Sequence, residues 1–189
     1  GVYGNTLSLT LNFVRSSKFQ YLSIFLVGAM LRGIPELLVS WYPIGYETIT
    51  FYAPVMMTFN SRGLVNVFQS TFTAGPLFYV LMWLAIVATG SHPFAILKVT
   101  APLLYGGLVV SFLLFLKKGL RLNSKMAFVA ALLLVFQVAA LRESWDRFRN
   151  LLGLTLAFAT LTALRSDHKY KWHFVAGLAV LTVLSREYI

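Results

Sequence analysis

The sequence contains no cysteine and few acidic residues, and each shortage excludes a class of chemistry. Without cysteine, neither disulfide bonds nor thiolate catalysis are possible. The chain has 3 histidines, and they are not spaced like zinc ligands. A phosphate-binding Walker loop and a dinucleotide-binding glycine fingerprint are also missing. These absences argue against a soluble enzyme that depends on such cofactors.

Apolar residues are abundant instead. Hydrophobic residues make up 58% of the 189-residue chain and charged residues only 12%, with a mean hydropathy of +0.75. Such values lie far outside the soluble average and predict an integral membrane protein with several spans. The net charge of +10 does not indicate nucleic-acid binding, because the cations stand in small groups at the ends of apolar runs. We therefore expect membrane lipid as a partner and no nucleic acid.

Five apolar runs predict an all-α bundle of about five membrane spans. They cover residues 18–39, 94–116, 126–141, 151–164 and 172–184. A further run at 76–88 is shorter than the roughly 20 residues that a span requires, so we expect an interfacial or re-entrant helix there.

Clusters of lysine and arginine predict how the bundle is oriented. The segment 117–125 carries four cations and no acid, which favours the cytoplasmic side. If each span from this cytoplasmic segment changes the side of the membrane, the loops at about 40–93 and about 142–150 are both extracytoplasmic. They are the first and the second outer loop. If 76–88 were a true span, the two loops would lie on opposite sides. The cations Arg15 and Lys18, before the first span, would then contradict the signal of 117–125.

The ends of the chain have no initiator methionine and no cleavable signal pattern, and the last predicted span ends close to the final residue. We expect residues 1–189 to form a single transmembrane domain that is the amino-terminal part of a longer protein.

Segment 141–150 concentrates five charges between two uncharged apolar runs, and we expect a short polar loop that joins two spans. If helix continues through it, Glu143 and Asp146 share one face, and Glu143 can pair with Arg147. A salt-bridge network that caps two spans would explain these residues. In the functional alternative, Asp146 or Glu143 holds a divalent cation or a sugar hydroxyl. Arg147 or Arg149 then approaches a phosphate.

Several short motifs follow one another along the chain. The first outer loop carries Glu47 in the sequence Gly-Tyr-Glu-Thr, and Gly-Pro-Leu-Phe at 75–78 follows. Lys-Lys-Gly at 117–119 ends a span, and the charged segment comes later. The order of these features resembles the membrane glycosyltransferases of the C-type (GT-C) fold, including oligosaccharyltransferase catalytic subunits and protein O-mannosyltransferases. The chain departs from the family where Glu47 replaces the commoner aspartate, and where Glu143-x-x-Asp146 replaces the Asp-x-Asp of oligosaccharyltransferases.

The resemblance implies an enzyme that transfers a sugar from a polyprenyl-phosphate carrier to a protein, glycan or lipid acceptor on the extracytoplasmic face. Such a transfer needs a carboxylate to accept the acceptor's proton, and a cation or metal to assist the departing phosphate. We predict Glu47 as the catalytic carboxylate. Its alternative is an interfacial acid that hydrogen-bonds the loop backbone. His92 is a further substrate-binding candidate, although a histidine before Pro93 is typical of a turn.

A divalent cation, Mg²⁺ or Mn²⁺, is the expected cofactor if one is needed, with Asp146, Glu143 and Glu47 as its candidate ligands.

Few charges lie within the predicted spans. Arg32 and Glu36 close the first span four residues apart, where they could pair across one turn or extend to the interface. Lys98 extends to the interface or marks an anionic lipid head group. The main alternative function is a transporter or channel component, which would place binding groups near the membrane midplane. Since most charges here stand at span ends, we favour the glycosyltransferase.

Overall fold

The computed structural model describes residues 17–39 and 41–185, and within these residues the regular structure is helical, with no strand. The all-α prediction is therefore confirmed for this part of the chain, whereas Arg15 lies outside it. The elements in chain order are α2 (Ser17–Leu38), η1 (Thr48–Tyr52), α3 (Ala53–Met57), η2 (Phe59–Ser61), α4 (Leu64–Ser70), α5 (Pro76–Thr89), α6 (Pro93–Leu114), η3 (Phe115–Gly119), α7 (Ser124–Phe136), α8 (Val138–Asp146), α9 (Phe148–Leu164) and α10 (Lys171–Leu184).

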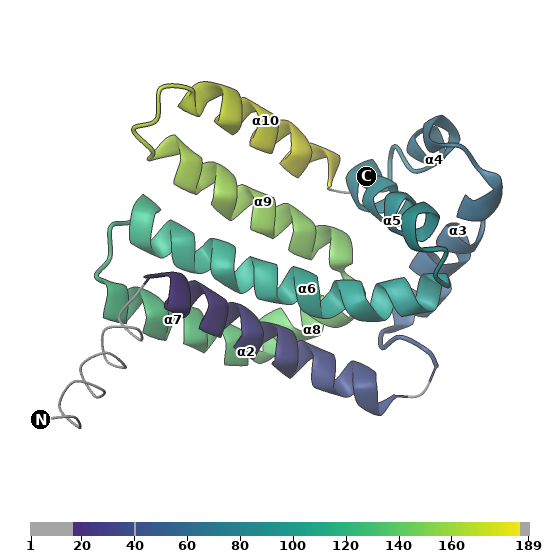
Figure 1. Ribbon diagram of the computed structural model, residues 1–189, viewed down its shortest axis with the longest axis horizontal. Coiled ribbons are helices and arrows are strands. Elements are labelled where there is room, and N and C mark those ends of the chain that lie inside the picture. Colours follow the sequence, from purple (N-terminus) through teal and green to yellow (C-terminus); the bar gives the residue numbers. More distant parts are fainter. Residues whose placement is uncertain (1–16, 40, 186–189) are drawn as a thin grey trace, which may run out of the picture.

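Helix α6 lies at the centre of the bundle, with α2 on one side, α9 on the other, and α10 packed against α9 (Figure 1). The short helices α3, α4 and α5 gather at one end, beside the beginning of α6 (Figure 1). Close packing of α2 on α6 depends on Gly106, because a Cβ there would lie 2.9 Å from the carbonyl oxygen of Phe25. A small residue at such a crossing lets two helix backbones approach.

Two helices are long and apolar enough to cross a membrane, at Lys18–Leu38 and Pro93–Gly119. They agree with the predicted spans at 18–39 and 94–116. The predicted span at 126–141 is broken, because Gln137 has extended backbone and α7 and α8 meet there at 57°. The two pieces make a third span only if they are counted together.

Helices α9 and α10 are shorter than the predicted five-span bundle requires. They have 17 and 14 residues. At about 1.5 Å per residue, α9 is only about 26 Å long, whereas the hydrocarbon layer is roughly 30 Å thick. Length and composition therefore support two to three spanning helices in the described residues, fewer than the predicted five. The predicted runs 151–164 and 172–184 end where these helices end, so the excess came from counting runs well below about 20 residues as spans.

Helix α5 matches the predicted short helix at 76–88, and its ends follow from three residues. Gly75 and Gly90 both have left-handed backbone, with φ of 77° and 64°, which is unfavourable for residues with a Cβ. Pro76 occupies the first turn, where its missing N–H is not needed. These residues limit α5 to 14 residues.

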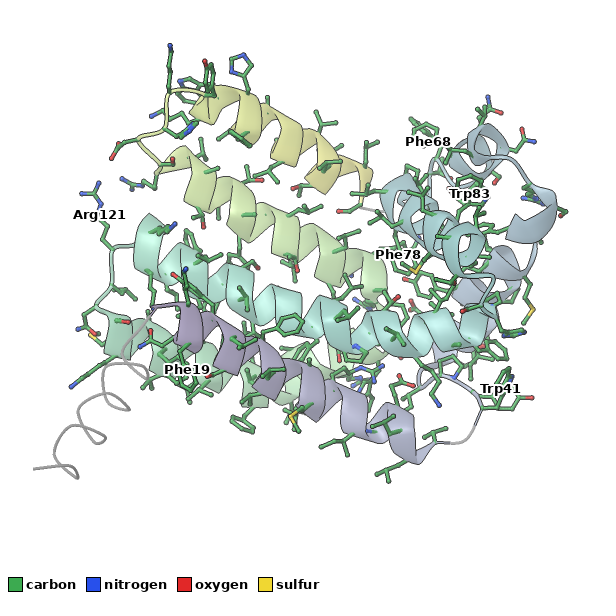
Figure 2. All side chains as sticks on the ribbon, in the orientation of Figure 1. Phe19, Trp41, Phe68, Phe78, Trp83 and Arg121 are labelled. Carbon is green, nitrogen blue, oxygen red and sulfur yellow. The ribbon has the colours of Figure 1, made fainter. Side chains whose placement is uncertain are left out.

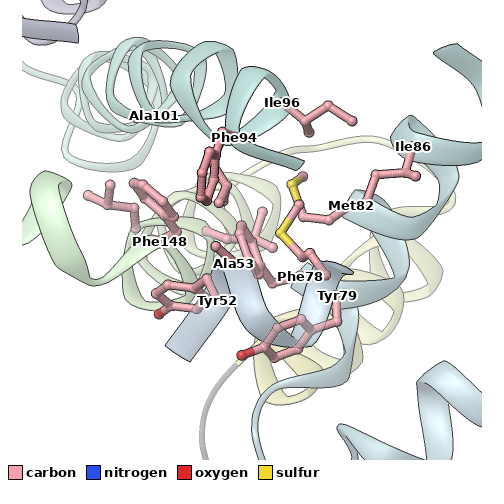
Figure 3. Packing of buried hydrophobic residues seen from close by; sticks show 14 of the residues in the cluster. Tyr52, Ala53, Phe78, Tyr79, Met82, Ile86, Phe94, Ile96, Ala101 and Phe148 are labelled. Atoms are coloured by element: carbon pink, nitrogen blue, oxygen red, sulfur yellow. The ribbon is translucent and has the colours of Figure 1, made fainter. Parts of the chain in front are cut away.

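Buried apolar side chains form two clusters. One lies where α3, α5, α6 and α9 meet and contains several aromatic rings, among them Tyr52, Phe78, Tyr79 and Phe148 (Figure 3). The other lies between α2, α6 and α7. Large apolar side chains also cover the outside of the bundle, and α10 has no buried residue. An apolar exterior of this kind fits a lipid environment.

Candidate functional site

The segment before η1 meets the junction between α8 and α9, although the two are about a hundred residues apart. The backbone N–H of Glu47 donates to Asp146 Oδ1 over 3.0 Å. The hydroxyl of Thr48 donates to the carbonyl oxygen of Trp145 over 2.9 Å. The two predicted acidic loops therefore lie together at one end of the bundle. This contact disfavours the alternative topology in which they lie on opposite sides of the membrane.

A buried ion pair holds the end of α2 against the same region. Arg32 Nη2 lies 2.6 Å from Glu36 Oε1, and both side chains are almost inaccessible to solvent. Arg32 Nε donates to the carbonyl oxygen of Ser144 over 3.1 Å, and Glu36 Oε2 accepts the backbone N–H of Ile44 over 3.1 Å. The pairing of Arg32 with Glu36 across one turn is confirmed. Its links to Ile44 and Ser144, which connect both loops to α2, were not visible in the sequence.

Arg149, in the first turn of α9, is held between two other elements. Its Nε donates to the hydroxyl oxygen of Tyr52 over 3.0 Å, and its Nη1 donates to the carbonyl oxygen of Ala74 over 2.6 Å. The guanidinium also lies 5.2 Å from the centre of the Tyr52 ring. A Cβ on Gly75 would approach Arg149 Cδ to 3.2 Å, so a glycine leaves room for this side chain.

Tyr52 is buried beside Arg149, and its hydroxyl has an unusual environment. Burial raises the pKa of the Tyr52 phenol, and the Arg149 guanidinium opposes that shift only in part. The phenol therefore remains neutral at physiological pH. It keeps a hydroxyl proton that it can donate while its oxygen accepts from Arg149.

An acidic side chain, Glu47, and a basic one, Arg149, line the same cavity. The cavity has a volume of about 360 Å³ and is lined by Glu47, Phe51, Val55, Ala74, Tyr79 and Arg149. Tyr79 stands beside Tyr52, with ring centres 6.0 Å apart, and both are labelled in Figure 3. A carboxylate, a guanidinium and a phenol on mostly apolar walls form the kind of site that orients a polar ligand.

A second cavity of about 330 Å³ shares the residues Val55, Ala74 and Tyr79 with the first. Arg62 contributes a second cation there. Neither Tyr79 nor Arg62 was predicted from the sequence. An isolated arginine and a tyrosine among many aromatic residues give no pattern by which to find them.

The other predicted site residues do not line the Glu47 cavity. Glu143 and Arg147 form an ion pair of 3.5 Å with both side chains well exposed. His92 Nδ1 accepts the N–H of Phe94 over 3.2 Å and so caps α6, as expected of a turn residue. Asp146 reaches the site through the backbone of Glu47.

Helix covers almost all of the segment 141–150, so the alternative in which helix continues through it describes its backbone. Helix α8 continues to Asp146 and α9 begins at Phe148, with a break only at Arg147. Glu143 and Arg147, four residues apart, form the ion pair that their spacing predicts.

The fit of a divalent cation can be judged from the carboxylates. No group of three or more histidine or acidic side chains gathers anywhere in residues 17–39 and 41–185. Mg²⁺ requires less, since it keeps several waters and is often held by one or two carboxylates and a substrate phosphate. The Glu47 carboxylate together with a substrate phosphate would meet that smaller requirement, whereas Asp146 Oδ1 is bonded to the backbone N–H of Glu47. Glu143 is engaged with Arg147 and is not part of the set.

The chain matches no protein-family model, no curated protein and no solved structure.

Proposed function

We propose that this chain belongs to a GT-C-like membrane glycosyltransferase, which takes a sugar from a polyprenyl-phosphate carrier on the extracytoplasmic face. The observation that supports the proposal most directly is the shared cavity of Glu47 and Arg149. These two side chains supply the carboxylate and the cation that glycosyl transfer from a lipid phosphate requires.

In this scheme the acceptor hydroxyl or amide loses its proton to the Glu47 carboxylate as its heteroatom bonds to the anomeric carbon of the sugar. The bond between that carbon and the phosphate oxygen breaks, and the electron pair leaves with the polyprenyl phosphate. Arg149 stabilises the negative charge that develops on the phosphate. A divalent cation, when bound, would neutralise part of the same charge.

Asp146 and Tyr52 act through the two principal residues. Asp146 accepts a hydrogen bond from the backbone N–H of Glu47 and so fixes the position of the Glu47 backbone, from which the carboxylate extends. Tyr52 accepts from Arg149 Nε and holds the plane of the guanidinium. Small displacements of reacting groups reduce rates severely, so we expect both to behave as positioning residues.

The proposal includes five spans, with α9 and α10 crossing the membrane beside α6. The support is their arrangement, since α9 packs along α6 and α10 along α9 (Figure 1). A bilayer can thin around helices that are somewhat short, at a modest cost per Å of mismatch.

The test is turnover of the full-length protein with a panel of dolichyl- and undecaprenyl-phosphate hexoses, measured as released polyprenyl phosphate. Glu47→Gln has nearly the same volume but cannot accept a proton, so we expect kcat to fall about 100-fold or more. Glu47→Asp keeps the carboxylate, and we expect it to stay within about tenfold of the wild type.

Arg142→Gln is the matched control, because Arg142 is exposed on α8 and does not line the cavity. Full turnover by Glu47→Gln, or an equal loss in Arg142→Gln, would show that the carboxylate is not the base.

A transporter is the second candidate, and one observation favours it. Helix α7 and helix α8 form a bent pair at Gln137, and broken helices often carry transport sites. However, Gln137 is exposed and lines neither of the two cavities described above. Uptake of polyprenyl-free sugars into proteoliposomes, without release of polyprenyl phosphate, would favour the transporter.

A further inference from the structure

The end of the bundle remote from Glu47 holds a larger cavity, of about 590 Å³. It lies between the end of α6 with η3 and the end of α9. Figure 2 shows Arg121 at this end, far from Phe78 and Trp41. The cavity therefore belongs to a different place from the candidate active site.

Four cations and one acid line this cavity. The cations are Lys117, Lys118, Arg121 and Arg165, and the acid is Asp167. The two ion pairs found in the described part of the chain, Arg32 with Glu36 and Arg147 with Glu143, involve none of them. Such an excess of positive charge around a concave site attracts an anion.

Lys117 differs from the other three cations, because it is partly buried and contacts α2. Its Nζ donates to the side-chain oxygen of Gln20 and lies 4.9 Å from the centre of the Tyr21 ring. Lys118, Arg121 and Arg165 are exposed at the rim. They can turn toward a ligand without breaking a packed core.

The backbone at Arg121 is strained. Its φ of 56° lies in the left-handed region, which residues with a Cβ seldom occupy. The turn ends η3 with bonds from the N–H of Leu120 to Phe115 O and of Leu122 to Leu116 O, both 3.0 Å. Helix ends of this form usually have glycine at the left-handed position. An arginine there costs stability, and such strain is characteristic of functional positions.

The inner wall of the cavity is apolar and reaches into the bundle. Leu114, Ala159 and Ala163 line it beside Ser111 and Thr162. From Ser111 to the end of η3 is about 12 Å of helix, so the cavity extends from the cationic rim into the apolar part of α6 and α9. A ligand that fills it needs an anionic head and an apolar continuation.

We infer that this cavity binds the phosphate head group of an anionic membrane lipid. Basic pockets between membrane helices, on the side that carries the lysine and arginine clusters, bind such head groups. The cationic rim binds the phosphate, and the apolar wall contacts the beginning of the acyl chains. The inference rests on the membrane placement of α6 and α9 and is independent of the proposed transferase.

The test is lipid binding to the full-length protein in a neutral detergent, followed by native mass spectrometry and by the melting temperature. The probes are phosphatidylglycerol, phosphatidylcholine and inorganic phosphate. We expect phosphatidylglycerol to bind and to raise the melting temperature, and neither of the other two to do so at the same concentration. Equal stabilisation by phosphatidylcholine would overturn the site. Equal stabilisation by inorganic phosphate would overturn the lipid as its ligand.

Two variants locate the binding. Arg121→Gly removes a cation and suits the left-handed backbone, so lost binding cannot be attributed to lost folding. Lys118→Gln removes a second, exposed cation. We expect each to weaken phosphatidylglycerol binding about fivefold. Lys125→Gln is the control, because Lys125 belongs to the same basic segment but does not line the cavity. Unchanged binding in Arg121→Gly and Lys118→Gln, or an equal loss in Lys125→Gln, would contradict the inference.

Discussion

Gly45 lies where the segment before η1 touches the end of α8, and its lack of a side chain permits that contact. Its φ is 120°, outside the range that residues with a Cβ favour. A Cβ there would lie 2.5 Å from Asp146 Oδ1 and even closer to the carbonyl oxygen of Trp145. The hydrogen bond from Glu47 to Asp146 therefore depends on a glycine two residues away.

Gly45→Ala should destabilise the protein by about 2 to 4 kcal/mol, because it adds both backbone strain and a steric clash. The measurement is denaturant unfolding in detergent micelles. Gly63→Ala is the control, because a Cβ at Gly63 meets no atom within 4 Å and φ is −73°. We expect a change of under about 0.5 kcal/mol there. Similar losses in both variants would show that Gly45 has no special role.

Helix α2 is connected to α8 by polar groups that lie within an apolar bundle. Arg32 and Glu36 are almost inaccessible to solvent, and their hydrogen bonds reach Ser144 and Ile44. Removing a charge from water is costly, so such a pair contributes little net stability. It instead favours the one packing arrangement in which both charges keep their partners. The pair holds both polypeptide segments of the candidate site against one helix. The exposed pair of Glu143 and Arg147 has no comparable role.

Glu36→Gln should destabilise the protein by about 3 to 5 kcal/mol, because it leaves the buried Arg32 charge without its partner. The double variant Arg32→Met, Glu36→Leu removes both charges, and we expect it to recover most of that loss. Glu143→Gln serves as the surface comparison, with an expected cost below about 1 kcal/mol. Unfolding free energies of the three variants would decide the matter. A loss in Glu36→Gln no larger than in Glu143→Gln would contradict the argument.

The bundle as a whole has two chemically different ends. One end carries the Glu47 cavity, with its single acid and base. The other carries the larger cavity with its excess of cations. Cations concentrate on the cytoplasmic side of membrane proteins, so the charge distribution predicts that the Glu47 end faces away from the cytoplasm. Helices α2, α6 and α9 connect the two ends (Figure 1).

The absence of native cysteine allows this orientation to be measured directly. We expect single cysteines at the exposed positions Tyr46 and Arg142 to react with a membrane-impermeant thiol reagent on intact cells. A cysteine at Lys125 should react only after the membrane is permeabilised. Labelling of Tyr46→Cys and Arg142→Cys from opposite sides would contradict the contact of Glu47 with Asp146. Labelling of Lys125→Cys from outside would reverse the orientation.

The sequence alone determined the class of the protein and many of its helices, because both depend on local composition. The apolar runs predicted an all-α membrane chain, and punctuation by Gly75, Pro76 and Gly90 limited α5 to a short helix. The spacing of Arg32 and Glu36 was enough to predict that they pair. Such features involve residues within a few turns of one another, whose periodicity and spacing can be read directly.

Only the tertiary structure decided how the candidate site is assembled. Glu47 meets Asp146 across 99 residues, and Arg149 meets Tyr52 across 97. It also showed that helix covers almost all of the charged segment, with a break only at Arg147, and that another break lies at Gln137. Contacts of this kind depend on which helix faces pack together, and no local pattern of residues specifies that packing. Composition therefore predicted a chain of apolar helices, whereas the contacts of the segment around η1 with α8 and α9 determined that Glu47 and Arg149 share a cavity.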